Sequence, residues 1–205
     1  MKKSKWNELE VALLVLLAVC LLTGAAALRR QDDLQQKMIR LHVVANSDSE
    51  RDQALKLQVR DKVLAFTEQT MRSAESREAA NEALRASLPE IERMAEDTLL
   101  ESGCVDSVEA RLEPAEFPLK AYDGFRLPAG EYMALRVLIG EAEGQNWWCV
   151  VYPPLCTAAC TDLEDVAVQA GMDEADMKLI TGQEGYVLKF RAVELWERLR
   201  QWLGK

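Results

Sequence analysis

The sequence predicts an α+β domain, with helices packed on an antiparallel sheet, preceded by an N-terminal signal or anchor helix. Three observations lead to this fold class: an unbroken apolar run at Val11–Leu22, a change from helical to two-residue periodicity after Cys104, and a composition of 49% hydrophobic and 29% charged residues. Such a balance is typical of a globular domain. It excludes a wholly disordered chain and a protein with many membrane spans.

The N-terminal segment has the layout of an export signal. A basic start precedes the apolar run, uncharged residues continue to Leu28, and Ala25–Ala27 offers the small side chains that a signal peptidase accepts. The run is also just long enough to cross a bilayer, so residues 1–27 are either a cleaved signal peptide or a membrane anchor. Both alternatives place the rest of the chain outside the cytoplasm.

The remainder divides by composition into four parts. Residues 28–37 are polar and predict a linker, residues 38–160 an α+β core domain, residues 161–185 a variable acidic segment, and residues 186–205 a C-terminal amphipathic helix. The apolar positions of that last helix recur at helical spacing. They are Leu188, Ala192, Leu195, Leu199 and Trp202 or Leu203.

The core domain begins with a strand at residues 39–45, where apolar residues alternate with Arg40 and His42. Its polar end, Asn46–Ser49, favours a turn, and Ser47 or Asp48 would cap the helix that follows. Apolar residues then recur at helical spacing, with Lys56 beside the stripe. They are Leu55, Val59, Val63 and Phe66.

Further helices are predicted at about Glu75–Ser87 and from Pro89 until Ser102 and Gly103 end that helix, since proline suits the first turn of a new helix. Three helices would therefore follow one another. A strand is predicted around Val108–Leu112, and alternating residues from Gly130 to Tyr152 indicate a β-hairpin around a Gly140–Gly144 loop.

The exported part contains four cysteines, Cys104, Cys149, Cys156 and Cys160. An oxidising compartment permits three complete pairings among them. Cys149 with Cys156 is the preferred pair, because Pro153 and Pro154 between them can reverse the chain. The alternative is that some or all remain small buried thiols.

The residue types and their spacing give little support for an enzymatic function. The single histidine, His42, rules out a multi-histidine zinc site, and no phosphate-binding loop, dinucleotide fingerprint or serine-nucleophile elbow occurs. Two constellations remain conceivable: a Cys–His nucleophile from Cys149 and His42, and a carboxylate pair from Asp48 and Asp52. Helix capping and a half-exposed strand histidine explain these residues without catalysis. We therefore expect no enzyme and no cofactor, and the net charge of −9 argues against nucleic acid as a partner.

Two segments look more specific than packing requires. One is the turn after the first strand, and the other contains two adjacent tryptophans, which must point to opposite faces of their strand. Partner contacts are the expected use of both. The candidate contact residues are Asn46, Ser47, Asp48, Ser49, Asp52, Trp147 and Trp148.

The same segments resemble stage II sporulation protein R, in blocks that occur in the right order between about residues 38 and 156. The blocks are Ile39–Ser49, Asp52–Gln53 with Leu55–Lys56 and Val59–Asp61, Pro128–Tyr132, Asn146–Val150 and Pro153–Cys156. Residues 161–205 lie outside the resemblance.

The resemblance implies a signalling protein without catalytic residues. Members of this family are exported from the forespore into the space between forespore and mother cell. There they activate a membrane-embedded aspartic protease of the mother cell, which removes the pro-sequence of sigma factor E. The expected partner is the extracytoplasmic face of that protease, and the expected membrane contact is through the N-terminal segment alone. The alternatives are a secreted cell-wall hydrolase and a structural protein of the forespore envelope.

Overall fold

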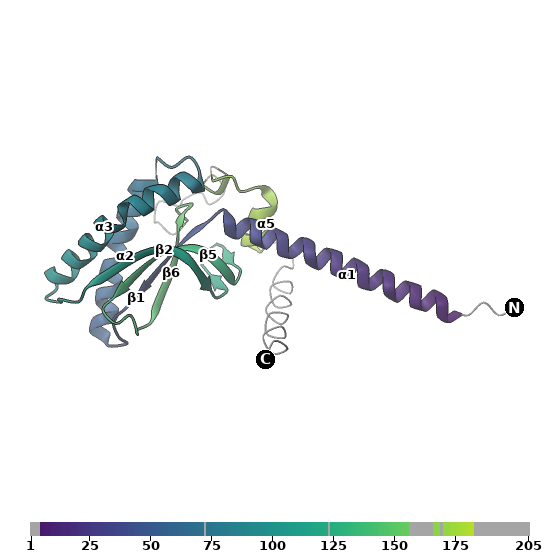
Figure 1. Cartoon of the computed structure of the whole chain (residues 1–205), viewed down its shortest axis with the longest axis horizontal. Coiled ribbons are helices and arrows are strands. Elements are labelled where there is room, and N and C mark those ends of the chain that lie inside the picture. The colour runs from purple at the N-terminus through teal and green to yellow at the C-terminus, as the bar shows by residue number, and fades with distance from the viewer. Residues whose placement is uncertain (1–4, 72, 123, 156–165, 169, 183–205) are drawn as a thin grey trace. The chain divides into compact units, whose positions relative to one another are not determined.

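The computed structural model describes residues 5–71, 73–122, 124–155, 166–168 and 170–182. The chain divides into two compact units, Met1–Leu34 and Gln35–Lys205. The helices and strands, drawn in Figure 1, are α1 (Lys5–Gln36), β1 (Ile39–Val44), α2 (Glu50–Met71), α3 (Arg77–Glu101), β2 (Val108–Phe117), β3 (Lys120–Ala121), β4 (Arg126–Leu127), β5 (Gly130–Ile139), β6 (Asn146–Tyr152) and α5 (Glu174–Thr181).

Helix α1 is long and apolar enough to cross a membrane. Its candidate span, Glu8–Gln36, contains a window of 18 residues with a mean hydropathy of 2.8, and none of that window is buried. A signal sequence meets the same criterion, so the helix is compatible with both the signal and the anchor predicted from the sequence. The polar segment that follows the apolar run is helical up to Gln36.

The main sheet has four strands in the order β2-β5-β1-β6. Strand β1 is antiparallel to β6 but parallel to β5, with Leu41 opposite Leu135, and β2 is antiparallel to β5. The α+β class is therefore confirmed, whereas the sheet is mixed instead of antiparallel. A second, two-stranded sheet pairs β3 with β4.

The hairpin predicted between Gly130 and Tyr152 is wrong, because β1 lies between its two arms. The arms do form strands and do run antiparallel, but each pairs with β1. A strand that is buried on both faces is stable in the middle of a sheet, and five of the six residues of β1 are buried. Local alternation in β5 and β6 carried no information about this insertion.

Two helices, not the predicted three, lie between β1 and β2 in the described part of the chain. The predicted break at Pro89 is absent, since Pro89 lies inside the continuous helix α3. An internal proline removes one backbone hydrogen bond and costs about 3 kcal/mol. Burial of apolar residues on both sides of it, Leu84 and Ile91, offsets that cost. Ser76 caps the helix by accepting a hydrogen bond from the Ala79 amide at 3.2 Å.

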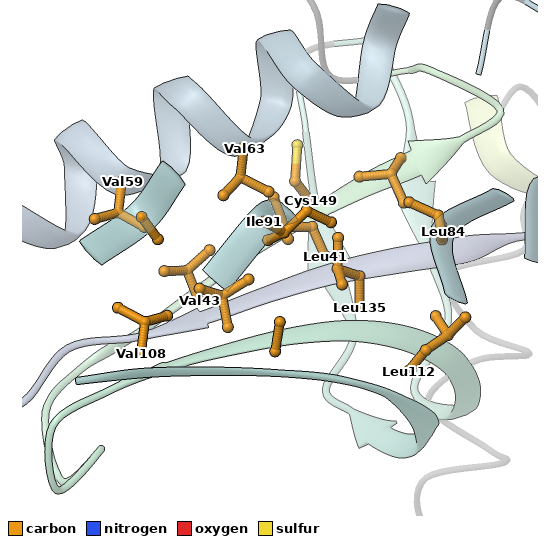
Figure 2. Close-up of a cluster of buried hydrophobic side chains, with 14 of the residues drawn as sticks. Leu41, Val43, Val59, Val63, Leu84, Ile91, Val108, Leu112, Leu135 and Cys149 are labelled. Atoms are coloured by element: carbon orange, nitrogen blue, oxygen red, sulfur yellow. The ribbon is translucent and has the colours of Figure 1, made fainter. Parts of the chain in front are cut away.

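The hydrophobic core lies between one face of the sheet and the helices α2 and α3, which cover that face (Figure 1). Side chains from alternate sheet positions meet side chains from the inner faces of both helices (Figure 2). The labelled members of this cluster are Leu41, Val43, Val59, Val63, Leu84, Ile91, Val108, Leu112, Leu135 and Cys149. The apolar stripe predicted for α2 is thereby confirmed at Leu55, Val59 and Val63.

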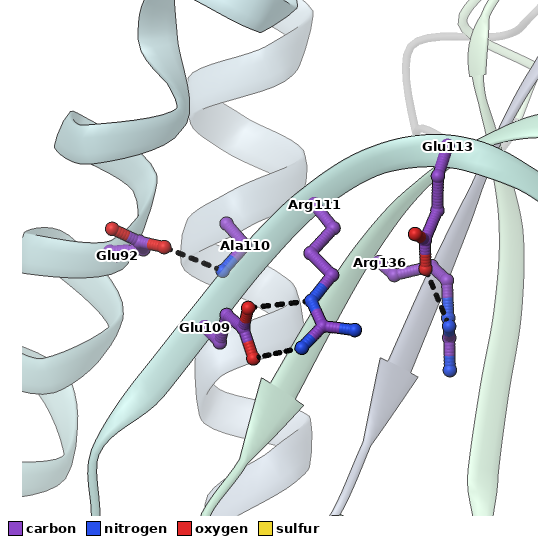
Figure 3. A network of polar contacts seen from close by, with 6 residues as sticks. All are labelled: Glu92, Glu109, Ala110, Arg111, Glu113 and Arg136. Carbon is purple, nitrogen blue, oxygen red and sulfur yellow. Dashed lines mark hydrogen bonds and ion pairs between the residues drawn. The ribbon is translucent and has the colours of Figure 1, made fainter.

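Helix α3 also protects the outer edge of β2. The carboxylate of Glu92 accepts a hydrogen bond from the Ala110 amide at 2.9 Å (Figure 3), and that of Glu96 accepts one from the Val108 amide at 3.2 Å. Pro114, on the same edge strand, has no amide to offer. An edge with part of its donors occupied or absent is a poorer template for pairing with another strand.

Leu135 provides a test of the core. It is fully buried in β5, whereas Leu100 on α3 is 57% exposed. Leu135→Ala will lower the free energy of unfolding by about 2–5 kcal/mol, because it leaves a cavity among tightly packed neighbours. Leu100→Ala will change it by less than about 0.5 kcal/mol. Urea denaturation of the two variants in detergent micelles measures both, and equal losses would contradict this core.

Candidate functional site

The two adjacent tryptophans of β6 lie on opposite faces of the sheet. Trp147 is opposite Val43 and lies on the helix-covered side, where the guanidinium of Arg60 from α2 is 4.4 Å from its ring centroid. Trp148 points to the second face, where Nζ of Lys120 is 4.2 Å from its ring centroid. The predicted opposite orientation is confirmed, and each tryptophan forms a cation–π contact.

The turn after β1 is held together by its own side chains. The carboxylate of Asp52 accepts hydrogen bonds from Oγ of Ser47 at 2.6 Å and from Nδ2 of Asn46 at 3.1 Å. The Asp52 amide donates to Oγ of Ser49 at 3.1 Å, so Ser49 caps α2, and the predicted cap at Ser47 or Asp48 is wrong. The bond from Ser47 is the main cause that lowers the pKa of Asp52. The turn is therefore preorganised around one carboxylate.

The loop between β5 and β6 is bonded to this turn. Asn46 accepts a hydrogen bond from the Glu141 amide through Oδ1 at 2.9 Å, and Ala45 accepts one from the Gly144 amide at 2.9 Å. Gly144 is required there, because a Cβ atom at this position would overlap the carbonyl group of Ser47. Turn and loop therefore form one rigid unit at this end of β1.

Lys56 joins α2 to the same loop. Its ammonium group donates to Oε1 of Gln53 at 2.5 Å and to the carbonyl oxygen of Gln145 at 2.9 Å. The residue is buried, and burial lowers the pKa of the ammonium group. The sequence placed Lys56 only beside the apolar stripe, because spacing along one helix does not reveal a loop that packs over it.

Six of the seven predicted contact residues separate into two groups, and the seventh, Trp148, is half-buried on the second face of the sheet. Asn46, Ser47 and Asp52 are partly buried and bonded within the turn. Asp48, Ser49 and Trp147 are exposed. Because Asp52 is occupied by its hydrogen bonds within the turn, it does not form a free carboxylate pair with Asp48.

The second face of the sheet contains a buried guanidinium that sequence reasoning missed. Arg40 is fully buried, its Nη2 donates to the hydroxyl of Tyr122 at 2.5 Å, and its guanidinium carbon is 4.0 Å from the Phe117 ring centroid and 4.9 Å from that of Tyr132. Burial lowers the pKa of Arg40. Its Nε and Nη1 atoms find no hydrogen-bond acceptor among the residues that the structure describes. The sequence did contain a signal for this burial. Apolar residues flank the arginine on both sides within one strand, and such a pattern indicates a strand in the middle of a sheet.

His42 lies next to this group on β1. Its ring stacks on Trp148 with a centroid distance of 5.9 Å, and its Nε2 is 2.6 Å from Oδ1 of Asn146. Burial, together with the positive charges of Arg136 and Arg40, lowers the pKa of His42, while the bond to Asn146 opposes the shift. The surroundings of the ring therefore favour its neutral form.

The conceivable nucleophile from Cys149 and His42 is wrong. Cys149 belongs to the core between sheet and helices, whereas His42 points to the other face, and Cys149 is disulfide-bonded. Cys20 and Cys104 are free. Cys156 lies outside the described residues, so its pairing with Cys149 stays a prediction. Within the described part of the chain, no three acidic, histidine or cysteine side chains come together as a metal site would require.

The loop between β5 and β6 offers a matched pair of variants. Gly144→Ala will lower the free energy of unfolding by about 1–3 kcal/mol, because the added methyl group overlaps backbone. Ala142 has a φ of 54°, which an L-residue adopts at a cost. Ala142→Gly will therefore leave stability unchanged or raise it by up to about 1 kcal/mol. Thermal unfolding of both variants checks this, and a stable Gly144→Ala protein would disprove the close packing of turn and loop.

His42 makes stability depend on pH. Because its pKa in the folded protein is below the ordinary 6.5, the unfolded chain binds the proton more tightly. The resulting stabilisation is complete above pH 6.5 and is lost as the pH falls through the lower, folded pKa. Relative to His42→Gln, the wild type will lose up to about 1.4 kcal/mol per pH unit over that range. Urea denaturation between pH 7.5 and 5 measures the difference, and parallel curves for the two proteins would contradict it.

Comparison with known proteins connects this arrangement to a family. A model of stage II sporulation protein R matches residues 35–162. Stage II sporulation protein R of Bacillus subtilis (strain 168) is 39% identical over 123 residues, which cover 60% of this chain and 55% of that protein. The chain thus spans about half the length of this curated relative. No solved structure matches.

The matched range includes all four strands of the main sheet, the turn after β1 and both tryptophans of β6. It excludes α5. Since the family model covers more than half of the chain, the protein belongs to the stage II sporulation protein R family.

Proposed function

We propose that this chain is an exported sporulation signal that activates a membrane-embedded aspartic protease of the mother cell, so that the pro-sequence of sigma factor E is removed. Membership of the family supports a role in sporulation and is the observation that carries the proposal. The apolar helix α1 supports export from the forespore, either as a signal or as an anchor. The domain would act in the space between the two cells, without a cofactor.

Activation by contact has a simple energetic requirement. The domain must bind the active arrangement of the protease more tightly than the inactive one, since a ligand with equal affinity for both shifts nothing. A difference of about 3 kcal/mol would change the ratio of the two states more than a hundredfold. A rigid binding surface favours such a difference, because little conformational entropy is lost on docking.

The bonded turn and loop provide a rigid surface of this kind. Asp48, Ser49 and Trp147 are exposed there, and we assign them direct contact with the extracytoplasmic face of the protease. Asn46, Ser47 and Asp52 would act indirectly, by holding the turn in shape. Tryptophan is enriched among the residues that dominate binding energy.

A reconstituted cleavage assay tests the function. The full chain, the protease and the sigma factor precursor are combined in lipid vesicles, and precursor cleavage is followed by gel electrophoresis. Cleavage will depend on the chain. The double variant Asp48→Ala with Trp147→Ala will reduce the rate about tenfold or more at limiting concentration, because both side chains contribute to binding.

The matched control is Asp97→Ala, which removes an exposed carboxylate from the outer side of α3. Its activity will equal that of the wild type. Equal cleavage with and without the chain would refute the proposed function. Dependence on the chain with a fully active double variant would leave the function standing and move the contact surface elsewhere.

A further inference from the structure

Charges on the second face of the sheet are distributed unevenly. On the β2–β5 side each arginine has a carboxylate: Arg111 pairs with Glu109 and Arg136 with Glu113, both at 2.6 Å (Figure 3). These strands expose ion pairs that are already satisfied. Such pairs offer little net attraction to a charged partner.

The β1–β6 side differs. Arg40 and Lys120 form no ion pair with any carboxylate in the described part of the chain, and both lie against aromatic rings. We define the cationic aromatic patch as Arg40, His42, Lys120, Tyr122 and Trp148. Tyr122 connects β1 to β6. Its hydroxyl accepts a hydrogen bond from Arg40 on β1 and donates one to the carbonyl oxygen of Trp148 on β6 at 3.4 Å.

Arg40 gives this patch a fixed positive charge. The residue is fully buried, and two of its nitrogen atoms have no acceptor within the described residues. A buried charge without a counter-ion is costly, and its field is weakly screened by water. A negative group brought to the surface above it would therefore be attracted more strongly than by an exposed arginine.

The rest of the domain is acidic by comparison. The chain has a net charge of −9, and the outer side of α3 alone exposes several carboxylates. These are Glu78, Glu82, Glu90, Asp97 and Glu101. The patch is thus a positively charged area on an acidic protein, and this distribution would orient an acidic partner during encounter.

We propose that the cationic aromatic patch binds an acidic peptide segment of the partner protein, with carboxylates next to Lys120 and above Arg40 and with apolar atoms against Trp148. This inference deepens the proposed function and rests on it for the identity of the partner, which is the extracytoplasmic part of the protease. Aromatic rings already stacked on cations are rigid and lose little entropy on binding. A long polyanion such as nucleic acid does not fit, because the rest of the surface repels it.

Binding is measured on the full chain in nanodiscs of a zwitterionic lipid, without protease. The probe is a capped octapeptide of alternating glutamate and glycine, and the readout is calorimetric titration at low ionic strength. The glutamate peptide will bind, and its lysine counterpart will not. Lys120→Glu will weaken binding about fivefold or more, because it reverses the charge of the half-buried lysine of the patch.

Lys62→Glu is the matched control, since Lys62 is exposed on α2, which covers the other face of the sheet. It makes the same charge change and will alter affinity less than about twofold, because solvent screens distant charges. Absence of peptide binding, or equal weakening by both variants, would overturn the proposal. Lys120-dependent binding of phosphatidylglycerol vesicles in place of the peptide would also overturn it, in favour of a membrane surface.

These outcomes are independent of precursor cleavage. Failure to bind the peptide removes the patch as a docking site and leaves the cleavage assay to decide the function. Conversely, peptide binding by a chain that does not support cleavage would separate the patch from protease activation.

Discussion

Burial of β1 on both of its faces is the constraint on which the rest of the domain depends. One face of this strand supplies Leu41 and Val43 to the core beneath α2 and α3, and the other supplies Arg40 and His42 to the second face. A strand of this kind must lie inside the sheet, so β5 and β6 flank it. The six residues of β1 therefore contribute side chains to the packing on both faces of the sheet.

The position of β1 also explains how the candidate contact surface arises. Because the strand runs between β5 and β6, the turn at its end meets the loop that joins them, and Gly144 lets the two backbones touch. Ser47 and Asn46 then direct Asp52 inward and leave Asp48 exposed. The segments that carry the family resemblance are adjacent in space for this reason, although about a hundred residues separate them in the sequence.

Local patterns in the sequence predicted most elements of the fold but not their arrangement. Alternation identified β1 and β5, and helical spacing identified the inner face of α2, because these signals arise within one element. The parallel pairing of β1 with β5 depends on contacts between distant segments, which no local pattern contains. Pro89 was misread because tertiary packing outweighs a local helix signal. In the candidate site, strand geometry alone predicted that Trp147 and Trp148 point in opposite directions. The burial of Arg40 and Lys56 could not be predicted in this way, because it depends on the distant segments that pack over them.

We propose that this domain acts by contact, through the turn and the cationic aromatic patch, while α3 serves the core and the sheet edge. Hydrogen–deuterium exchange of the full chain, with and without the protease in lipid nanodiscs, tests it most directly. We expect binding to slow exchange in residues 47–52, in the β3–β4 hairpin and in β6, and to leave the amides of α3 unchanged. Protection confined to α3, with none in those three segments, would contradict it.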